Sequence, residues 1–185
     1  MNDSTNQQYD AVLHSCRDIF LKKTRDYGTS WRVLRPISIA DQLFIKARRI
    51  RTLQEAREQR VEEDKAGEFR AMVNYGIIGL IQLSVTGSDF TEDIPSDTAE
   101  KWYDEKAAVA RKTMLDKNHD YGEAWRDMSQ EGYVDLITMK ILRIRQIVAN
   151  EGKTLISEGI DSNYIDIINY SVFALIMIGE GKHIG

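Results

Sequence analysis

The fold is decided by the stretch Asp26-Tyr27-Gly28-Thr29-Ser30-Trp31-Arg32, which the chain repeats as Asp120-Tyr121-Gly122-Glu123-Ala124-Trp125-Arg126. At an offset of 94 residues the register continues without a gap to Arg51 and Arg145, and ten of these 26 aligned positions are identical. Self-similarity at a fixed period is typical of repeat architectures. The sequence therefore predicts a tandem duplication of one module.

With one inserted residue the match resumes, and it places Asn74-Tyr75 on Asn169-Tyr170. Each copy is thus a module of about 90 residues. We expect repeat one over residues 1–86, a linker over 87–96 and repeat two over 97–185.

Each copy has three segments in which apolar residues recur at helical spacing. No segment alternates apolar and polar residues, so we expect an all-α protein without a sheet. Modules of this size would bury little apolar surface alone, so we expect the two three-helix repeats to share one core as a helical bundle with a pseudo-two-fold axis. The expected helices span about 8–27 and 97–121, then begin near Ser38 and Gly132, and again near Gly67 and Ser162. Gly28 and Gly122 follow the first helices, where a residue with positive φ commonly ends a helix.

The composition limits the function classes. A net charge of -4 argues against broad nucleic-acid binding, which needs a dense basic surface. Cys16 is the single cysteine, so an internal disulfide and a multi-cysteine zinc site are excluded. The N-terminal residues do not resemble a secretory signal, and the longest apolar run, 165–179, is too short to cross a bilayer. We therefore expect a cytoplasmic protein with no membrane association, and a homo-oligomer is compatible with the sequence.

The repeated aromatic pair has two interpretations. In the structural one, the glycine ends the helix while tyrosine and tryptophan pack beneath the turn, and a duplicated fold would repeat such a turn for that reason alone. In the functional one, Tyr27 and Trp31, and their counterparts Tyr121 and Trp125, contact a base, as aromatic side chains do in nucleic-acid sites.

A repeated basic pair is the strongest indication of a ligand. Lys46 and Arg49 recur as Lys140 and Arg143, and on a helical wheel they lie outside the arc of the apolar positions. Arginine offers a planar fork and lysine a compact charge for phosphate. The sequence therefore predicts an anion or phosphate site, unless carboxylates inside the fold neutralise these side chains.

Other repeated polar residues have structural explanations. In repeat one, Ser38 and Asp41 have the spacing of a capping box. In repeat two, Gly132 takes the cap position before Asp135. Metal ligation is the alternative role for both aspartates. Two asparagines, at positions 74 and 169, lie in apolar helices, where buried polar groups need partners. We expect them to form hydrogen bonds that join the two halves, and contact with a base or a sugar hydroxyl is the alternative.

Carboxylates decide whether the protein could be a metal-dependent enzyme. Mg²⁺ binds oxygen ligands, usually one or two carboxylates together with substrate phosphates. Neither copy has two acids at i and i+3 on its third helix, because Glu68-x-x-Ala71 aligns with Asn163-x-x-Asp166. A magnesium site would combine both copies, and the alternative is a set of solvated surface acids. The candidate ligands are Glu63, Glu68, Glu158 and Asp166.

The motifs Lys-x2-Asp-Tyr-Gly-x-[Ser/Ala]-Trp, Asp-x4-Lys-x2-Arg and Asn-Tyr, in this order, resemble the nucleotide modification associated domain family. The resemblance covers both halves, roughly 23–83 and 117–178, and it implies a role in nucleotide or modified-base metabolism in bacteria and phages. A weaker similarity is to the all-helical MazG-like nucleotide pyrophosphohydrolases, which hold Mg²⁺ on paired Glu-x-x-Glu and Glu-x-x-Asp helices. This chain lacks that clean pattern of acids.

Two functional hypotheses follow. In the first, the protein binds a nucleotide or another phosphorylated small molecule, the basic pairs hold its phosphates, and hydrolysis, if it occurs, is Mg²⁺-dependent. In the second, the chain is a non-enzymatic interaction module whose repeated polar residues are structural. The second hypothesis predicts that Lys46 and Arg49 pair with carboxylates inside the fold.

Overall fold

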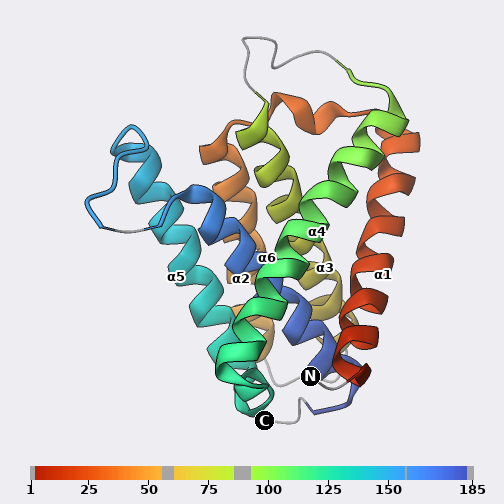
Figure 1. Ribbon diagram of the computed structural model, residues 1–185, viewed down its shortest axis with the longest axis vertical. Coiled ribbons are helices and arrows are strands. Elements are labelled where there is room, and N and C mark those ends of the chain that lie inside the picture. Colours follow the sequence, from red (N-terminus) through yellow and green to blue (C-terminus); the bar gives the residue numbers. More distant parts are fainter. Residues whose placement is uncertain (1–2, 56–60, 86–92, 157, 183–185) are drawn as a thin grey trace.

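A computed structural model of the chain describes residues 3–55, 61–85, 93–156 and 158–182. This part of the chain contains α-helices and two short 3-10 helices but no strand, so the all-α class is confirmed (Figure 1). The elements are α1 (Asp3–Tyr27), η1 (Ser30–Val33), α2 (Pro36–Glu55), α3 (Val61–Ser84), α4 (Ser96–Tyr121), η2 (Ala124–Asp127), α5 (Gln130–Ala149) and α6 (Ile160–Gly179). The order helix, 3-10 helix, helix, helix therefore occurs twice, as the duplication predicts. The expected linker lies outside the described residues from 87 to 92, so the repeat boundaries stay a prediction.

The turn after the first helix of each repeat is the predicted one. Gly28 has φ of 63° and Gly122 has φ of 64°, a conformation that glycine adopts without strain. The 3-10 helices that follow were not predicted, although they contain the Trp-Arg pair of the repeated stretch.

The capping-box interpretation of Ser38 and Asp41 is wrong. The helix α2 already begins at Pro36, and proline suits the first helical position because its φ is fixed and it needs no N–H partner there. In repeat two the cap is Ser129, whose side chain accepts a hydrogen bond from the N–H of Gly132 at 3.0 Å.

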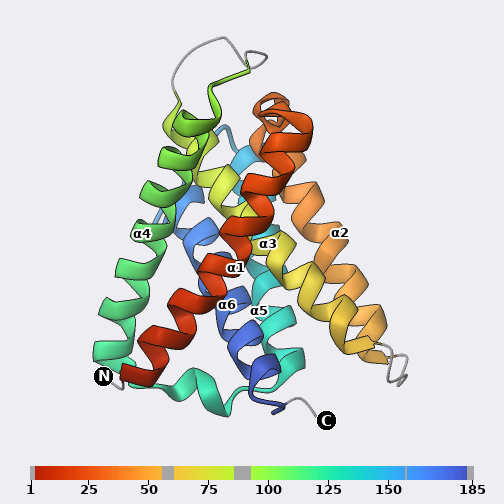
Figure 2. The ribbon, with the colours of Figure 1, turned by 90° about the vertical axis from the view of Figure 1, so that its right-hand side faces the viewer.

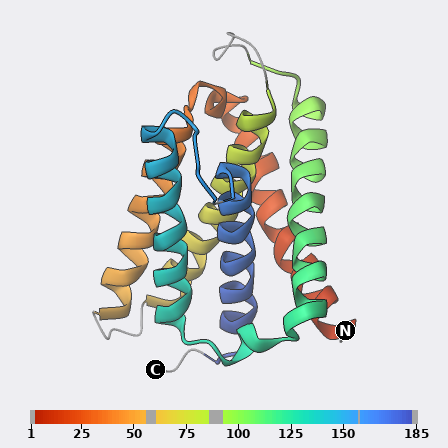
Figure 3. The ribbon, with the colours of Figure 1, turned by 60° about the vertical axis from the view of Figure 1, so that its left-hand side comes forward.

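The helices form three adjacent pairs, with α3 and α6 between α1 and α4 on one side and α2 and α5 on the other (Figures 2 and 3). One apolar cluster with members from all six helices forms the core. The central helices α3 and α6 pack closely at Gly79, where a Cβ would lie only 2.6 Å from the ring of Tyr164. The two repeats therefore share one core, as expected for modules of this size.

Two symmetric hydrogen-bond chains join the repeats. Tyr9 donates its hydroxyl hydrogen to Asn169 Oδ1 at 2.6 Å, and Asn169 Nδ2 donates to the carbonyl of Ala110 at 3.2 Å. In the matching chain, Tyr103 donates its hydroxyl hydrogen to Asn74 Oδ1 at 2.8 Å, and Asn74 Nδ2 donates to the carbonyl of Cys16 at 3.0 Å. The prediction that the two asparagines form hydrogen bonds joining the halves is confirmed.

Ion pairs follow the same symmetry. The carboxylate of Asp41 lies 2.6 Å from Arg145 on α5, and its counterpart Asp135 lies 3.9 Å from Arg51 on α2. On the opposite side of the bundle, the pairs Arg17–Asp104 and Arg111–Asp10 each have a distance of 2.6 Å. The two aspartates of the Asp-x4-Lys-x2-Arg motif therefore face arginines of the other repeat.

Among the described helices, α6 alone has the length and composition of a membrane crossing. In this fold 72% of that segment is buried, as befits a central core helix. The expectation of a cytoplasmic protein stays a prediction.

The Tyr9–Asn169 hydrogen bond gives a stability prediction. Asn169→Ala should lower the free energy of unfolding by about 2 kcal/mol, because it leaves the Tyr9 hydroxyl and the Ala110 carbonyl buried without this partner. Urea unfolding of this variant, of Tyr9→Phe and of the double variant measures the coupling, which we expect to be about 1 kcal/mol. The control is Tyr27→Phe, because Tyr27 is 71% exposed. Strict additivity of the two single variants would contradict the proposed link between the repeats.

Candidate functional site

The predicted basic pairs are largely neutralised inside the fold. Lys46 Nζ lies 3.1 Å from Glu68 Oε2, and Arg49 lies 2.8 Å from the other oxygen of Glu68. Lys140 Nζ lies 2.6 Å from Asp166 Oδ2. A buried ammonium group needs such a partner because its desolvation is costly. This pairing of Lys46 and Arg49 is the one that the interaction-module hypothesis predicts.

The expectation of a helix face free of packing is wrong for Lys140, which is 9% exposed. It holds for Arg49 and Arg143, which are exposed. Arg143 donates a hydrogen bond to the sulfur of Met139 at 3.7 Å. The assignment of these side chains to a phosphate stays a prediction.

Asp166 binds a second cation. Its Oδ1 accepts a hydrogen bond from Lys117 Nζ at 2.6 Å, so this buried carboxylate bridges α4 and α5. Burial lowers the pKa of the Lys117 ammonium, but the hydrogen bond to Asp166 and its negative charge outweigh that effect, so the pKa is raised. One carboxylate therefore forms ion pairs with two lysines of repeat two.

The corresponding place in repeat one has no acid. Lys23 is the counterpart of Lys117, and the counterpart of Asp166 is Ala71. Beside it, Arg70 takes the position of Ile165. Within the described structure, neither Lys23 nor Arg70 forms an ion pair.

Lys23 and Arg70 line a pocket of about 500 Å³ between α1, η1 and α3, which we call the repeat-one pocket. Its remaining wall is mostly aromatic and apolar, with a few hydroxyl and amide groups. The other lining residues are Ile19, Phe20, Thr24, Tyr27, Gly28, Ser30, Trp31, Leu34, Gly67, Ala71, Asn74, Tyr75 and Ile78. The structure thus brings the predicted Tyr27 and Trp31 together with two cations, which are not the predicted ones.

The turn that carries Trp31 is fixed by polar contacts. Asp93 accepts hydrogen bonds from the backbone N–H and the hydroxyl of Thr29, at 2.7 and 2.5 Å. These two bonds lower the pKa of the Asp93 carboxyl. On the other side of η1, Arg32 donates to Gln82 Oε1 at 2.6 Å, and Gln82 Nε2 donates back to the Arg32 carbonyl at 2.7 Å. One wall of the repeat-one pocket is therefore held in place by its flanking residues.

The equivalent tryptophan in repeat two is covered. Trp125 is 6% exposed, and its ring stacks on Phe173 with centroids 4.3 Å apart and an interplanar angle of 6°. Phe173 takes the position of Ile78, which lines the repeat-one pocket. Trp31, by contrast, is only partly buried and meets Phe20 at 6.0 Å in a tilted arrangement. Tyr121 is 77% exposed.

A second and larger depression of about 1000 Å³ lies beside the segment between α5 and α6. It contains the predicted residues Arg143 and Glu158 but neither Lys140 nor Trp125. It also contains Asn163, which is buried and whose Oδ1 has no hydrogen-bond partner in the described structure.

The predicted magnesium ligands that are described do not gather in one place. Glu68 and Asp166 are each engaged by two cations, and the exposed Glu158 lies at the second depression. The side chain of Glu63 lies outside the described residues. Among the described side chains, no three acids, histidines or cysteines gather closely enough to hold a metal ion. The carboxylates that are described therefore do not favour Mg²⁺.

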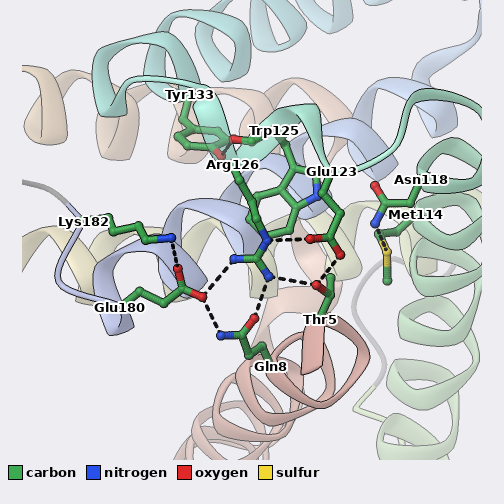
Figure 4. Close-up of polar contacts among 10 residues, drawn as sticks. All are labelled: Thr5, Gln8, Met114, Asn118, Glu123, Trp125, Arg126, Tyr133, Glu180 and Lys182. Carbon is green, nitrogen blue, oxygen red and sulfur yellow. Dashed lines mark hydrogen bonds and ion pairs between the residues drawn. The ribbon is translucent and has the colours of Figure 1, made fainter. Parts of the chain in front are cut away.

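A cluster around Arg126 was missed by the sequence analysis. Its guanidinium contacts Glu123 at 2.8 Å and Glu180 at 2.9 Å, and joins η2 to α1 and to the end of α6 (Figure 4). It also donates to Thr5 and Gln8, each at 2.8 Å. The identity of Arg32 and Arg126 was the available signal, since both arginines tie their 3-10 helix to neighbouring residues.

A scan against protein-family models matches the chain to nucleotide modification associated domain 1, at residues 23–83 and again at 117–178. The protein belongs to this family. Neither the search of curated proteins nor the search of solved structures returns a match.

The family's two matched segments begin at Lys23 and Lys117, of which Lys117 pairs with Asp166 and Lys23 forms no ion pair within the described structure. The sequence analysis passed over Lys23, although the motif Lys-x2-Asp-Tyr-Gly contains it. Arg70 gave no repeated signal in the sequence, because its counterpart at position 165 is isoleucine.

The Arg126 cluster gives a pH prediction. Hydrogen bonds from Gln8, Lys182 and Arg126 lower the pKa of Glu180 from 4.5 to about 2, so its stabilisation is complete above pH 4.5 and is lost as the pH falls toward 2. Glu180→Gln should therefore lower the free energy of unfolding at pH 7 by roughly 1 kcal/mol, a value reduced by solvent screening. Urea unfolding from pH 7 to pH 2.5 should show the difference between variant and parent shrinking below pH 4.5. The control is Glu105→Gln, an exposed site with no ion pair in the described structure; a difference independent of pH would contradict the assignment.

Proposed function

We propose that this protein binds a nucleotide in the repeat-one pocket. Lys23 and Arg70 hold the phosphate, and the rings of Tyr27, Trp31 and Tyr75 contact the base. The observation that carries the proposal is that two cations without a carboxylate partner among the described residues line the same aromatic pocket.

The charges favour an anionic ligand. Two positive side chains at one concave surface repel each other and attract an anion, and the low dielectric of the walls strengthens that field. Phosphate oxygens accept charge-assisted hydrogen bonds from lysine and arginine. The cations on α2 differ, because Glu68 already forms ion pairs with both Lys46 and Arg49.

The shape and the rings favour a nucleotide over a free phosphate. A pocket of about 500 Å³ falls within the range of about 300–1,000 Å³ for small-molecule sites. Aromatic rings supply flat apolar surface on which a base can stack. Membership of a family named for nucleotide modification supports the same class of ligand.

We propose no reaction, because Glu68 and Asp166 are each engaged by two cations and the described acids do not gather in a group that could hold Mg²⁺. The interaction-module alternative explains the Tyr–Asn and Asp–Arg links between repeats. It does not explain why Lys23 and Arg70 line a pocket whose described lining residues include no acid. A phosphate role for Lys46 or Lys140 would require a ligand to displace Glu68 or Asp166.

Calorimetric titration tests the proposal. The four deoxynucleoside monophosphates and triphosphates are titrated separately, with and without Mg²⁺, and inorganic phosphate serves as the comparison. We expect at least one nucleotide to bind more tightly than phosphate. Arg70→Ala should weaken that binding about tenfold or more, since hydrogen bonds to charged groups contribute about 1.5–3 kcal/mol.

The matched control is Arg25→Ala, which removes the same charge from an exposed position on α1 that does not line the pocket. Its affinity should stay within a factor of about three, because interactions between exposed charges are screened by salt. Absence of heat with every nucleotide would overturn the proposal.

A further inference from the structure

Among the described side chains, the buried acids of the two third helices lie at positions one helical turn apart. On α3 the acid is Glu68, followed at i+3 by Ala71, whereas on α6 position 163 is asparagine and the acid is Asp166. Residues three apart lie on the same helix face. The same face of the two central helices therefore carries its negative charge at two different heights.

This displacement decides which cation each acid neutralises. Glu68 engages Lys46 and Arg49, both on α2, and leaves the first-helix Lys23 alone. Asp166 engages Lys140 on α5 and also the first-helix Lys117. The first-helix lysine is thus unpaired within the described structure in repeat one and neutralised in repeat two.

Two neighbouring sequence differences also favour ligand binding by repeat one over repeat two. Arg70 of repeat one is replaced by Ile165, which removes the second cation. Ile78 is replaced by Phe173, whose ring covers Trp125 at 4.3 Å. At the positions equivalent to these pocket residues, repeat two therefore has one cation fewer, one acid more and a larger side chain.

A carboxylate fixed in the fold is a strong competitor for an external anion. Asp166 is 5% exposed and lies 2.6 Å from each of two lysine ammoniums, so it occupies the position that a ligand phosphate would need. A group held by the chain acts at a high effective concentration. A nucleotide at repeat two would have to displace it and leave a buried carboxylate unpaired.

We infer that the position of this one carboxylate selects the repeat that binds the nucleotide, so that each chain takes one nucleotide, in repeat one. The inference rests on the proposed function. In repeat two, Asp166 takes the place that the ligand phosphate takes in repeat one. The role of repeat two is therefore structural.

The first test adds the same carboxylate to repeat one. Ala71→Asp places an acid beside Lys23, and we expect it to weaken nucleotide binding about tenfold or more in the calorimetric titration. Ala71→Asn has nearly the same shape without the charge and should keep the affinity within a factor of about three of the parent. Equal affinity for the parent and the folded Ala71→Asp variant would overturn the inference.

The second test opens repeat two. The variant Asn163→Glu, Ile165→Arg, Asp166→Ala, Phe173→Ile gives α6 the residues of α3 at these positions, including an acid for Lys140 and Arg143. We expect the number of nucleotides bound per chain to rise from one to two. A parent that binds two nucleotides, or a folded variant that binds one, would overturn the inference and leave the proposed function intact. Absence of binding to the parent would overturn both, and the Ala71 pair decides if the fourfold variant does not fold.

Discussion

A lysine ammonium inside a helical bundle requires a carboxylate, and this requirement organises the charged residues of both repeats. Lys140 is nearly buried and is tolerated because Asp166 lies 2.6 Å away. Lys46 has Glu68 in the same role. Removing one partner of such a pair leaves an uncompensated charge, which is far more costly than the net contribution of the pair. Glu68 and Asp166 therefore stabilise the fold by neutralising these cations.

The duplication separates structural residues from candidate ligand residues. Several contacts between repeats occur as symmetric pairs, as in Tyr9–Asn169 and Tyr103–Asn74, or Asp41–Arg145 and Asp135–Arg51. A shared core with a pseudo-two-fold axis needs each contact twice, so these residues are alike in both copies. Among the pocket residues, Arg70, Ala71 and Ile78 have no part in these pairs and differ between the copies.

Much of the fold could be predicted from the sequence, because helical periodicity and a duplicated motif are local patterns. The six helices, the two glycine turns and the hydrogen-bonding role of Asn74 and Asn169 followed from such patterns. The partners Tyr9 and Tyr103 did not, since they lie far away in the sequence. The predicted cap at Ser38 was wrong because Pro36 begins the helix one turn earlier.

The candidate site was predicted only in part. Tyr27 and Trp31 line the repeat-one pocket, whereas the repeated Lys46 and Arg49 pair with Glu68. A helical wheel shows which face a residue occupies but not which neighbouring helix covers that face. Arg70 was not predicted because it is not repeated, since its counterpart is isoleucine.

Nuclear magnetic resonance of the indole N–H groups tests the central claim most directly, because Trp31 and Trp125 are equivalent positions within one molecule. In a ¹H–¹⁵N spectrum recorded during titration with the tightest-binding deoxynucleotide, the Trp31 signal should move and saturate at one equivalent, while the Trp125 signal stays in place. Equal movement of both signals, or movement of Trp125 alone, would contradict the account.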